Sequence, residues 1–247
     1  MSGARREGDG RGRLGAALSG MAVAVGCVLF LGGFVWGALV YQPYTVPTDS
    51  MSPTVQAGDR VLAERISGDE VRRGDVVVFR DKQWGDMPMV KRVVGVGGDE
   101  IVCCDGDGRL TINGKPVDEP YLHIEGPAAE RFTAEVPEGQ LFLLGDERKG
   151  SLDSRSHLQD AGQGSVPRSA VEARLDAVAW PLSGGAVERP EGFAALPGGV
   201  SQPGPVGLML VAVAAGAVLI VGGAAYGPTV DRLGGARRRK VVTAGAA

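Results

Sequence analysis

Two long apolar runs without a charged residue constrain this chain more than any other feature. They cover residues 21–40 and 206–226 of the 247-residue sequence. A helix rises about 1.5 Å per residue, so about 20 residues cross the roughly 30 Å hydrocarbon layer of a bilayer. Each run therefore predicts a transmembrane helix. The alternative for the first run is a cleavable secretory signal, but it is long for one and no small-x-small cleavage site follows it.

Basic residues lie on the outer side of both runs, and such residues are preferentially retained in the cytoplasm. We therefore expect cytoplasmic basic tails at residues 1–20 and 227–247, with the region 41–205 on the outer face of the cell membrane. The formal net charge of -3 hides basic ends around an acidic middle, so it gives no support to a nucleic-acid partner. The flanking basic residues are Arg5, Arg6, Arg11, Arg13, Arg232, Arg237, Arg238, Arg239 and Lys240.

The region between the runs predicts a mainly β domain over residues 41–182. Short alternating segments such as GDVVVFR and MVKRVVGV are separated by Gly, Asp and Pro, as in strands joined by turns. The turn sequences DGDG and NGKP predict a hairpin at residues 102–117. Residues 183–205 are rich in glycine and proline without sustained periodicity, so we expect a flexible tether to the second span.

The cysteines and histidines form no recognisable metal site, so we expect a mechanism without metal or cofactor. Cys27 lies in the first apolar run and is interpreted as a small apolar filler. Cys103 and Cys104 are adjacent, and because a bond between neighbours is strained we expect a minor structural or surface role for them. His123 and His157 have contexts typical of surface or turn histidines, which argues against a catalytic triad.

Ser50 and Lys91 are the candidates for peptide-bond chemistry. A serine beside proline and aspartate, as in TDSMSP, is by itself more often a turn residue or a helix cap. Hydrolysis also needs a base, and a buried lysine can serve because desolvation lowers its pKa. Lys91 lies in the apolar stretch MVKRVVGV, where strand alternation places Lys91 and Arg92 on opposite faces, one buried and the other exposed or paired. The alternative is that Lys91 reaches into water from an edge strand.

Four motifs, in order, resemble the conserved boxes of type I signal peptidases. They are SMSPTV at 50–55 with GDR at 58–60, RGDVVVF at 73–79, VKRVVGVGGD at 90–99, and GDERKGSLDSR at 145–155. The two-span layout resembles that of actinobacterial members. The resemblance implies an antiparallel β-sheet catalytic domain of the signal-peptidase type with one transmembrane helix at each end. It also implies a serine endopeptidase that removes signal peptides from secretory preproteins by cutting after small residues, typically Ala-x-Ala.

The resemblance assigns roles to individual residues. Ser50 matches the nucleophile and Lys91 its general base, while the Ser50 amide and Thr48 match an oxyanion hole. Ser151 matches the serine that orients the lysine amine. Glu147 stands where asparagine is common, beside Arg148, and we interpret this as a change with little effect on the chemistry. The residues that match a structural ion-pair cluster near the site are Arg92, Asp146, Asp153 and Arg155.

Substrate binding is expected along two segments. An extended peptide can add as a strand between residues 44–48 and residues 88–90, gaining main-chain hydrogen bonds. The bilayer is an expected partner because it holds enzyme and signal peptide together and raises their effective concentration. The protein-export machinery is a further candidate partner, whereas no nucleic acid or metal is expected. The residues expected to line shallow apolar pockets are Val46, Met51, Val55, Met89 and Val90.

Two rival interpretations remain open at this point. Self-cleaving repressors of the DNA-damage response share Ser-Lys chemistry, but they are soluble and carry a DNA-binding module, whereas this chain has two predicted spans. A catalytically silent, membrane-tethered β domain would show the same strands, yet a buried lysine would have no purpose in it. Processing assays of Ser50→Ala and Lys91→Ala distinguish this second class from a protease.

Overall fold

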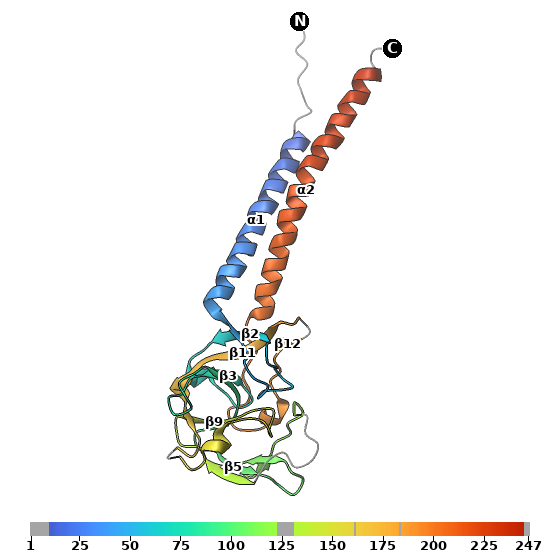
Figure 1. Ribbon diagram of the computed structural model, residues 1–247. Helices are drawn as coiled ribbons and strands as arrows, with labels where there is room; N and C mark the ends of the chain where they lie inside the picture. Colours follow the sequence, from blue (N-terminus) through green and yellow to red (C-terminus); the bar gives the residue numbers. More distant parts are fainter. Residues whose placement is uncertain (1–9, 123–130, 161, 183, 245–247) are drawn as a thin grey trace. The chain divides into compact units, whose positions relative to one another are not determined.

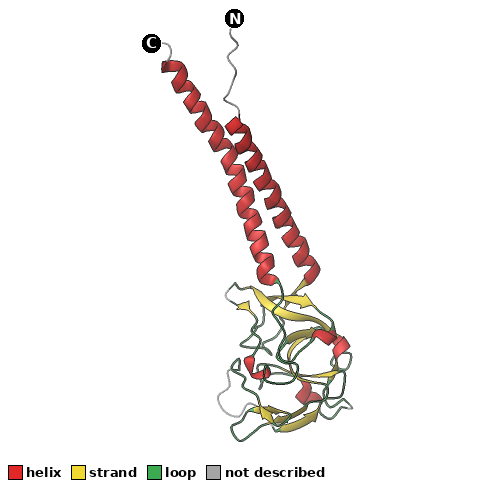
Figure 2. Ribbon diagram, turned by 180° about the vertical axis from the view of Figure 1, so that it is seen from behind, coloured by secondary structure: helices red, strands yellow, loops and turns green. Residues whose placement is uncertain are grey.

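The structure, a computed structural model, describes residues 10–122, 131–160, 162–182 and 184–244, with side chains from residue 14 to residue 226. His123 lies outside the described residues. The chain divides into two compact units, one formed by the two terminal helices and the other by residues Val40–Gly204. Figures 1 and 2 show the helices and the strands of the two units.

The helical unit consists of α1 (Gly10–Val40) and α2 (Val206–Ala244). Both are long and apolar enough to cross a membrane, over Leu14–Val40 and Val206–Tyr226. The first apolar stretch starts earlier than predicted, because residues 14–20 are also uncharged and continue the helix. Only 11% of each apolar window is buried inside the protein, so nearly all of this surface is left for lipid to cover.

Small residues bring α1 and α2 close together, as Figure 1 shows. A side chain added at Gly26 would lie 2.9 Å from the carbonyl oxygen of Gly216. Further along, the Ser19 hydroxyl donates a 2.7 Å hydrogen bond to the Gly223 carbonyl oxygen. Close backbone approach and bonds between helices are the main sources of helix association in lipid, where apolar burial contributes little.

The larger sheet of the β unit is antiparallel and has the strand order β1-β2-β11-β3-β4-β9-β10, with β12 pairing β11. This confirms the predicted antiparallel β architecture. Its strands are β1 (Tyr41–Thr45), β2 (Arg60–Arg65), β3 (Val76–Phe79), β4 (Met89–Val96), β9 (Gln140–Leu144), β10 (Val166–Pro167), β11 (Val171–Trp180) and β12 (Gly185–Ala186). Three short 3-10 helices of the described chain lie between strands, and a fourth lies between β12 and α2: η1 (Gly68–Glu70), η2 (Ser154–His157), η3 (Arg168–Ala170) and η4 (Glu191–Phe193).

A smaller antiparallel sheet has the order β7-β6-β5-β8 and contains the predicted hairpin. Its turn at Asn113 and Gly114 uses φ angles of 53° and 73°, the left-handed conformation that an Asn-Gly pair adopts readily. The hairpin expected at residues 102–117 is therefore confirmed. The strands are β5 (Glu100–Cys103), β6 (Leu110–Ile112), β7 (Lys115–Pro116) and β8 (Phe132–Glu135).

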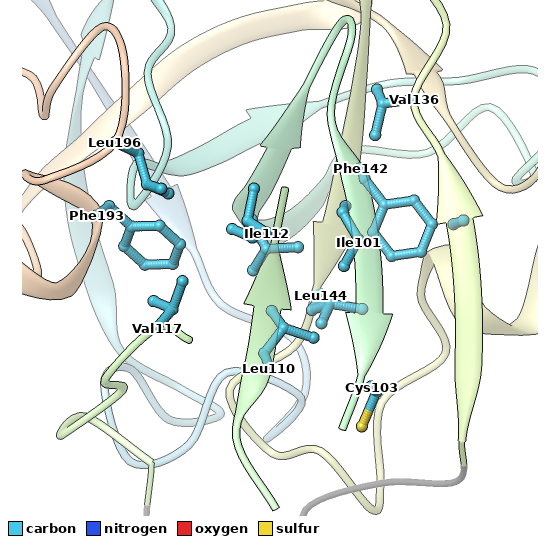
Figure 3. Close-up of a cluster of buried hydrophobic side chains, with 12 residues drawn as sticks. Ile101, Cys103, Leu110, Ile112, Val117, Val136, Phe142, Leu144, Phe193 and Leu196 are labelled. Carbon is cyan, nitrogen blue, oxygen red and sulfur yellow. The ribbon is translucent and has the colours of Figure 1, made fainter. Parts of the chain in front are cut away.

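Strand alternation divides the core into separate clusters. Val76 and Val78 of β3 pack in one cluster, whereas Val77 and Phe79 pack in another on the opposite face. A third cluster joins the smaller sheet to β9, and Figure 3 shows Phe142 in it beside residues of β5 and β6. Because successive strand residues point to opposite faces, β3 and β4 contribute to two cores at once.

Residues 185–204 are not the flexible tether that the sequence predicts. The segment pairs with β11 through β12, and the Phe193 side chain is fully buried in the third cluster. Arg189 forms a 2.6 Å ion pair with Asp176 of β11. Burial of a phenylalanine contributes about 1.5–3 kcal/mol. Such isolated anchors leave no periodic pattern in a Gly- and Pro-rich sequence, which is why the prediction was wrong.

The structure joins the cysteine pair, for which the sequence predicts a minor structural or surface role. Cys103 and Cys104 form a disulfide at the end of β5. Cys103 is buried in the third cluster and Cys104 packs against the same cluster. Cys27 of α1 is a free cysteine.

Candidate active site

The turn that carries Ser50 follows β1, and apolar side chains of the turn pack into the core. The side chains of Val46, Met51 and Val55 are 2%, 0% and 0% exposed. The Asp49 carboxylate accepts a 2.9 Å hydrogen bond from the Ala57 amide, which closes the turn. Apolar anchors on both sides of Ser50 therefore fix its backbone while its own side chain stays partly exposed.

Lys91 lies on β4, opposite Val77 of β3, and only 5% of it is exposed. Its Nζ lies 2.8 Å from the Ser50 Oγ and 3.1 Å from the Val90 carbonyl oxygen. The structure thus brings the two predicted catalytic side chains together from positions 41 residues apart. The predicted alternative, in which Lys91 reaches into water, is wrong because the amine points at the turn.

Burial lowers the pKa of Lys91 below its ordinary value. The carboxylates of Asp153 and Asp146 act in the opposite direction, because negative charge nearby favours the ammonium form. Desolvation is the larger effect, so the net direction is down. The shift is towards the neutral amine, which is the form able to accept a proton.

Thr48 lies beside the nucleophile, with its Oγ1 3.3 Å from the Ser50 Oγ. The Ser50 carbonyl oxygen accepts a 3.1 Å hydrogen bond from the Glu147 amide, so the turn is tied to the loop after β9. Within the described part of the chain, the Ser50 amide itself has no acceptor. Donors from residues 48 and 50 are thus available next to the serine hydroxyl.

The predicted ion-pair cluster consists of two separate bidentate pairs. Arg92 is 1% exposed and binds Asp146 through contacts of 2.8 and 2.7 Å. Arg155 binds Asp153 through two contacts of 2.8 Å, and Asp153 also accepts a bond from the Gly145 amide. Both carboxylates are engaged by arginines, which holds them at fixed positions near Lys91.

Ser151 is close to the nucleophile but does not contact the amine. Its Oγ is buried and has no hydrogen-bond partner among the described residues, while the partners of the Lys91 Nζ are Ser50 and Val90. A side chain at Gly145 would collide with the Ser151 side chain and the Ser50 carbonyl. The lysine-orienting role of Ser151 therefore stays a prediction, whereas Gly145 permits this close packing.

The residues expected to line substrate pockets do not form one surface. Val46, Met51 and Val55 belong to the core cluster under the turn, against which Val90 packs as a partly buried neighbour. Met89 packs against the cluster on the opposite face of β4. Strand alternation separates Met89 from Val90, so the two residues face different sides of β4, and the lining of the substrate pockets stays a prediction.

A buried network beside the site was not foreseen from the sequence. Arg148, expected near Glu147, instead binds Glu119 through contacts of 3.0 and 2.5 Å. Glu119 also accepts a 2.5 Å bond from the Tyr121 hydroxyl, and the Arg92 guanidinium lies 3.9 Å from the centre of the Tyr121 ring. Glu119 and Arg148 are 29 residues apart, and no local pattern connects them.

Two further observations limit what else the site can hold. A cavity of about 270 Å³ lies beside Arg92 and Tyr121, but neither Ser50 nor Lys91 lines it. In the portion of the chain that is described, no group of three His, Cys, Asp or Glu side chains could bind a metal ion.

The sequence of this chain is similar to those of known signal peptidases. The family described as signal peptidase, peptidase S26, matches residues 18–180. The probable signal peptidase I of Mycobacterium leprae is 31% identical over 209 residues, covering 61% of this chain and 72% of the relative. Signal peptidase I of Bacillus caldolyticus is 35% identical over 158 residues, covering 58% and 81%.

Among solved structures, a signal peptidase I from Enterococcus faecalis V583 is 29% identical. It aligns with a TM-score of 0.36, covering 42% of this chain and 96% of that one. The family match spans well over half of the chain and includes the segments of Ser50 and Lys91. This membrane protein with two apolar helices therefore belongs to the signal peptidase family, peptidase S26.

Proposed function

We propose that this signal peptidase cuts the peptide bond with a catalytic dyad of Ser50 and Lys91. The observation that carries the proposal is the 2.8 Å separation between the Ser50 Oγ and the Lys91 Nζ. Lys91 as a residue is only 5% exposed. A serine is a weak nucleophile until a base takes its proton, and a desolvated lysine can be that base near neutral pH.

The contacts of the amine suit this role. A neutral amine has one lone pair and two N–H bonds, so it can accept the Ser50 proton while donating to the Val90 carbonyl oxygen. Attack of the Oγ on the substrate carbonyl gives a tetrahedral intermediate, and Lys91 returns the proton to the leaving amino group. Water then attacks the acyl-enzyme with Lys91 again as the base, which restores Ser50.

The Ser50 amide and the Thr48 hydroxyl are the proposed oxyanion donors. The amide has no other acceptor among the described residues, and the Thr48 Oγ1 lies 3.3 Å from the reacting oxygen. Preorganised donors of this kind stabilise the negative charge that develops on the carbonyl oxygen. Removing one such donor typically lowers kcat by about 100- to 1000-fold.

Substrates are preproteins that carry signal peptides, and we propose that they bind as an added strand. β4 pairs with β3 from Met89 onward but pairs with β9 only from Arg92 onward, so one edge of Met89–Val90 has no strand partner in the described structure. β1 is the terminal strand of the sheet order, next to β2 alone. The edge of β1 and the edge of Met89–Val90 are thus both open in the described structure, which supports peptide addition.

Specificity for small residues of the Ala-x-Ala type is part of the proposal. The wall beside the turn is made by the branched side chain of Val90 and by Tyr44, both partly buried. Val46, Met51 and Val55 fill the space beneath. Bulky neighbours leave little room for a large substrate side chain at the cut.

We also propose the orientation given by the basic residues, with both tails in the cytoplasm and residues 41–204 on the outer face of the cell membrane. The packed segment 185–204 then belongs to the catalytic domain and not to a linker. The lipid bilayer is a proposed partner because of the two apolar helices, and the export machinery is a proposed partner because it delivers preproteins to the membrane. Protease added to intact cells should degrade the β unit and spare tags on both tails.

The deciding experiment is processing of a preprotein by the purified full-length enzyme in detergent. Wild-type protein should release the mature chain, and Ser50→Ala and Lys91→Ala should each lose nearly all activity while remaining folded. A metal chelator and a thiol reagent should leave processing intact. Undiminished processing by either alanine variant, or inhibition by the chelator, would refute the dyad, and no processing by wild type would refute the function.

A further inference from the structure

The loop Asp81–Pro88 joins β3 to β4 and leads directly into the proposed peptide-binding edge at Met89–Val90. The loop is closed on itself by a 2.9 Å bond from the Asp86 amide to the Asp81 carbonyl oxygen. The Asp81 carboxylate also accepts a 2.7 Å bond from the Gln83 amide. These bonds keep the loop compact. Because the loop ends at Pro88, its position fixes the start of β4 at Met89.

Trp84 fixes this loop to the segment that follows the last sequence box. Its ring stacks on His157, with ring centres 4.6 Å apart and planes 13° apart. Phe79, the last residue of β3, packs edge to face with the same indole, with ring centres 5.4 Å apart. His157 ends η2, and its Nδ1 lies 2.9 Å from Asp160. Each ring of the stack therefore has a second contact, Trp84 with Phe79 and His157 with Asp160.

A second, polar attachment holds the other side of the loop. Arg80 donates a 3.1 Å bond to the Asp86 carbonyl oxygen and another of 3.1 Å to Glu172. Glu172 accepts a 3.4 Å bond from the Tyr44 hydroxyl of β1, which is the other proposed peptide-binding segment. Arg80 and Glu172 are 44% and 36% exposed, so solvent weakens this attachment and the ring stack is the stronger one.

We propose that Trp84 and His157 are positioning residues that hold the Asp81–Pro88 loop, and with it the peptide-binding edge of β4. This inference rests on the proposed function, because it assumes that the substrate adds to that edge. The side-chain contacts of His157 are with Trp84 and Asp160. Its role is to hold the edge in the competent geometry before the peptide arrives.

The placement of Lys91 predicts which kinetic constant responds. Lys91 is paired across to Val77, and the next residue, Arg92, is paired to Leu144 of β9, so the catalytic amine is fixed from both sides. Met89 and Val90 depend on β3 and on the loop that precedes them. Releasing the loop lowers the fraction of enzyme that can accept substrate, which raises the apparent KM while kcat is kept.

The experiment measures kcat and KM for a preprotein with His157→Ala, Trp84→Ala, the double variant and His157→Phe, each as the full chain in detergent. Loss of an aromatic pair should raise KM about three- to tenfold and leave kcat within about twofold. The double variant should be no worse than Trp84→Ala, because the stack with His157 is already lost in that variant. His157→Phe keeps a ring over Trp84 and should restore the wild-type KM. Lys82→Ala, at an exposed position of the same loop, is the matched control and should change neither constant.

Several results would overturn the inference. They are an unchanged KM in both alanine variants, an equal KM rise in His157→Phe and His157→Ala, or a loss of activity that only follows the folded fraction measured by circular dichroism. Failure of the proposed function is distinguishable, since wild-type enzyme would then not process the preprotein at all. Faster limited proteolysis within residues 81–88 in the alanine variants, but not in His157→Phe, is expected as independent support.

Discussion

Replacement of Asp146 by asparagine isolates the buried charge of Arg92. In the wild-type protein the Arg92 side chain is 1% exposed, the Asp146 side chain is 0% exposed, and two bonds of 2.8 and 2.7 Å join them. The amide keeps the shape of the carboxylate but not its charge. The guanidinium cannot escape by losing its proton, because an arginine side chain stays protonated in proteins.

The cost of such a change is large compared with the stability of a domain. Removing one partner of a buried ion pair costs about 3–5 kcal/mol, whereas domains are stable by only about 5–15 kcal/mol. For a domain of this size each kcal/mol lowers the melting temperature by about 2–4 °C, so we expect a fall of about 6–20 °C. The cation–π contact of Arg92 with Tyr121 stays in place and offsets little of this.

The assay is thermal unfolding of the full chain in detergent, followed by circular dichroism in the β region. The matched control is Asp107→Asn, which makes the same chemical change in a pair whose aspartate side chain is 79% exposed. That variant should hardly move the melting temperature, because exposed pairs contribute little. Equal, small shifts in Asp146→Asn and Asp107→Asn would show that the buried pair is not what holds β4 to the loop after β9.

Three further predictions concern the dyad, its surroundings and the helices. Because burial lowers the pKa of Lys91, kcat/KM should rise with pH through that lowered pKa and then level off, and a rate that falls across this range would contradict a neutral-amine base. Gly145→Ala should reduce kcat about 10- to 100-fold, since the added methyl group displaces Ser151 and the Ser50 carbonyl, and wild-type kcat would show that the turn can adjust. Gly216→Leu should push α2 away from Gly26 and weaken cross-linking between cysteines introduced on the two helices, whereas Gly222→Leu, where the added side chain meets nothing, should leave it unchanged.

The parts of this protein that the sequence reveals are those set by local patterns. Charge-free runs identify α1 and α2, and alternation with turn residues identifies the strands and the Asn113–Gly114 hairpin. Lys91 is noticeable because a charge inside an apolar strand is rare, whereas its match with Ser50 was expected from the resemblance of the motifs and not from the strand pattern.

What the sequence does not reveal depends on contacts between distant segments. The Arg148 contact with Glu119 joins residues 29 positions apart, and nothing in either neighbourhood favours the other. The packing of residues 185–204 depends on single anchors such as Phe193 that have no period. Motif resemblance gives the position of Met89 along β4, whereas the face on which it packs is fixed by the core that it enters.

The neighbouring cations of β4 show how one strand supports two opposite electrostatic requirements. Lys91 and Arg92 are both nearly inaccessible, and burial acts to lower the pKa of both; at Arg92 the Asp146 carboxylate and other nearby groups outweigh burial and the pKa is raised, whereas the pKa of Lys91 is lowered. Arg92 has a carboxylate in bidentate contact, whereas the nearest oxygens of the Lys91 amine are a hydroxyl and a backbone carbonyl. The arginine engages Asp146 and keeps that carboxylate from binding the amine directly. In the proposed mechanism, the structural ion pair thereby helps to keep the adjacent lysine available as a base.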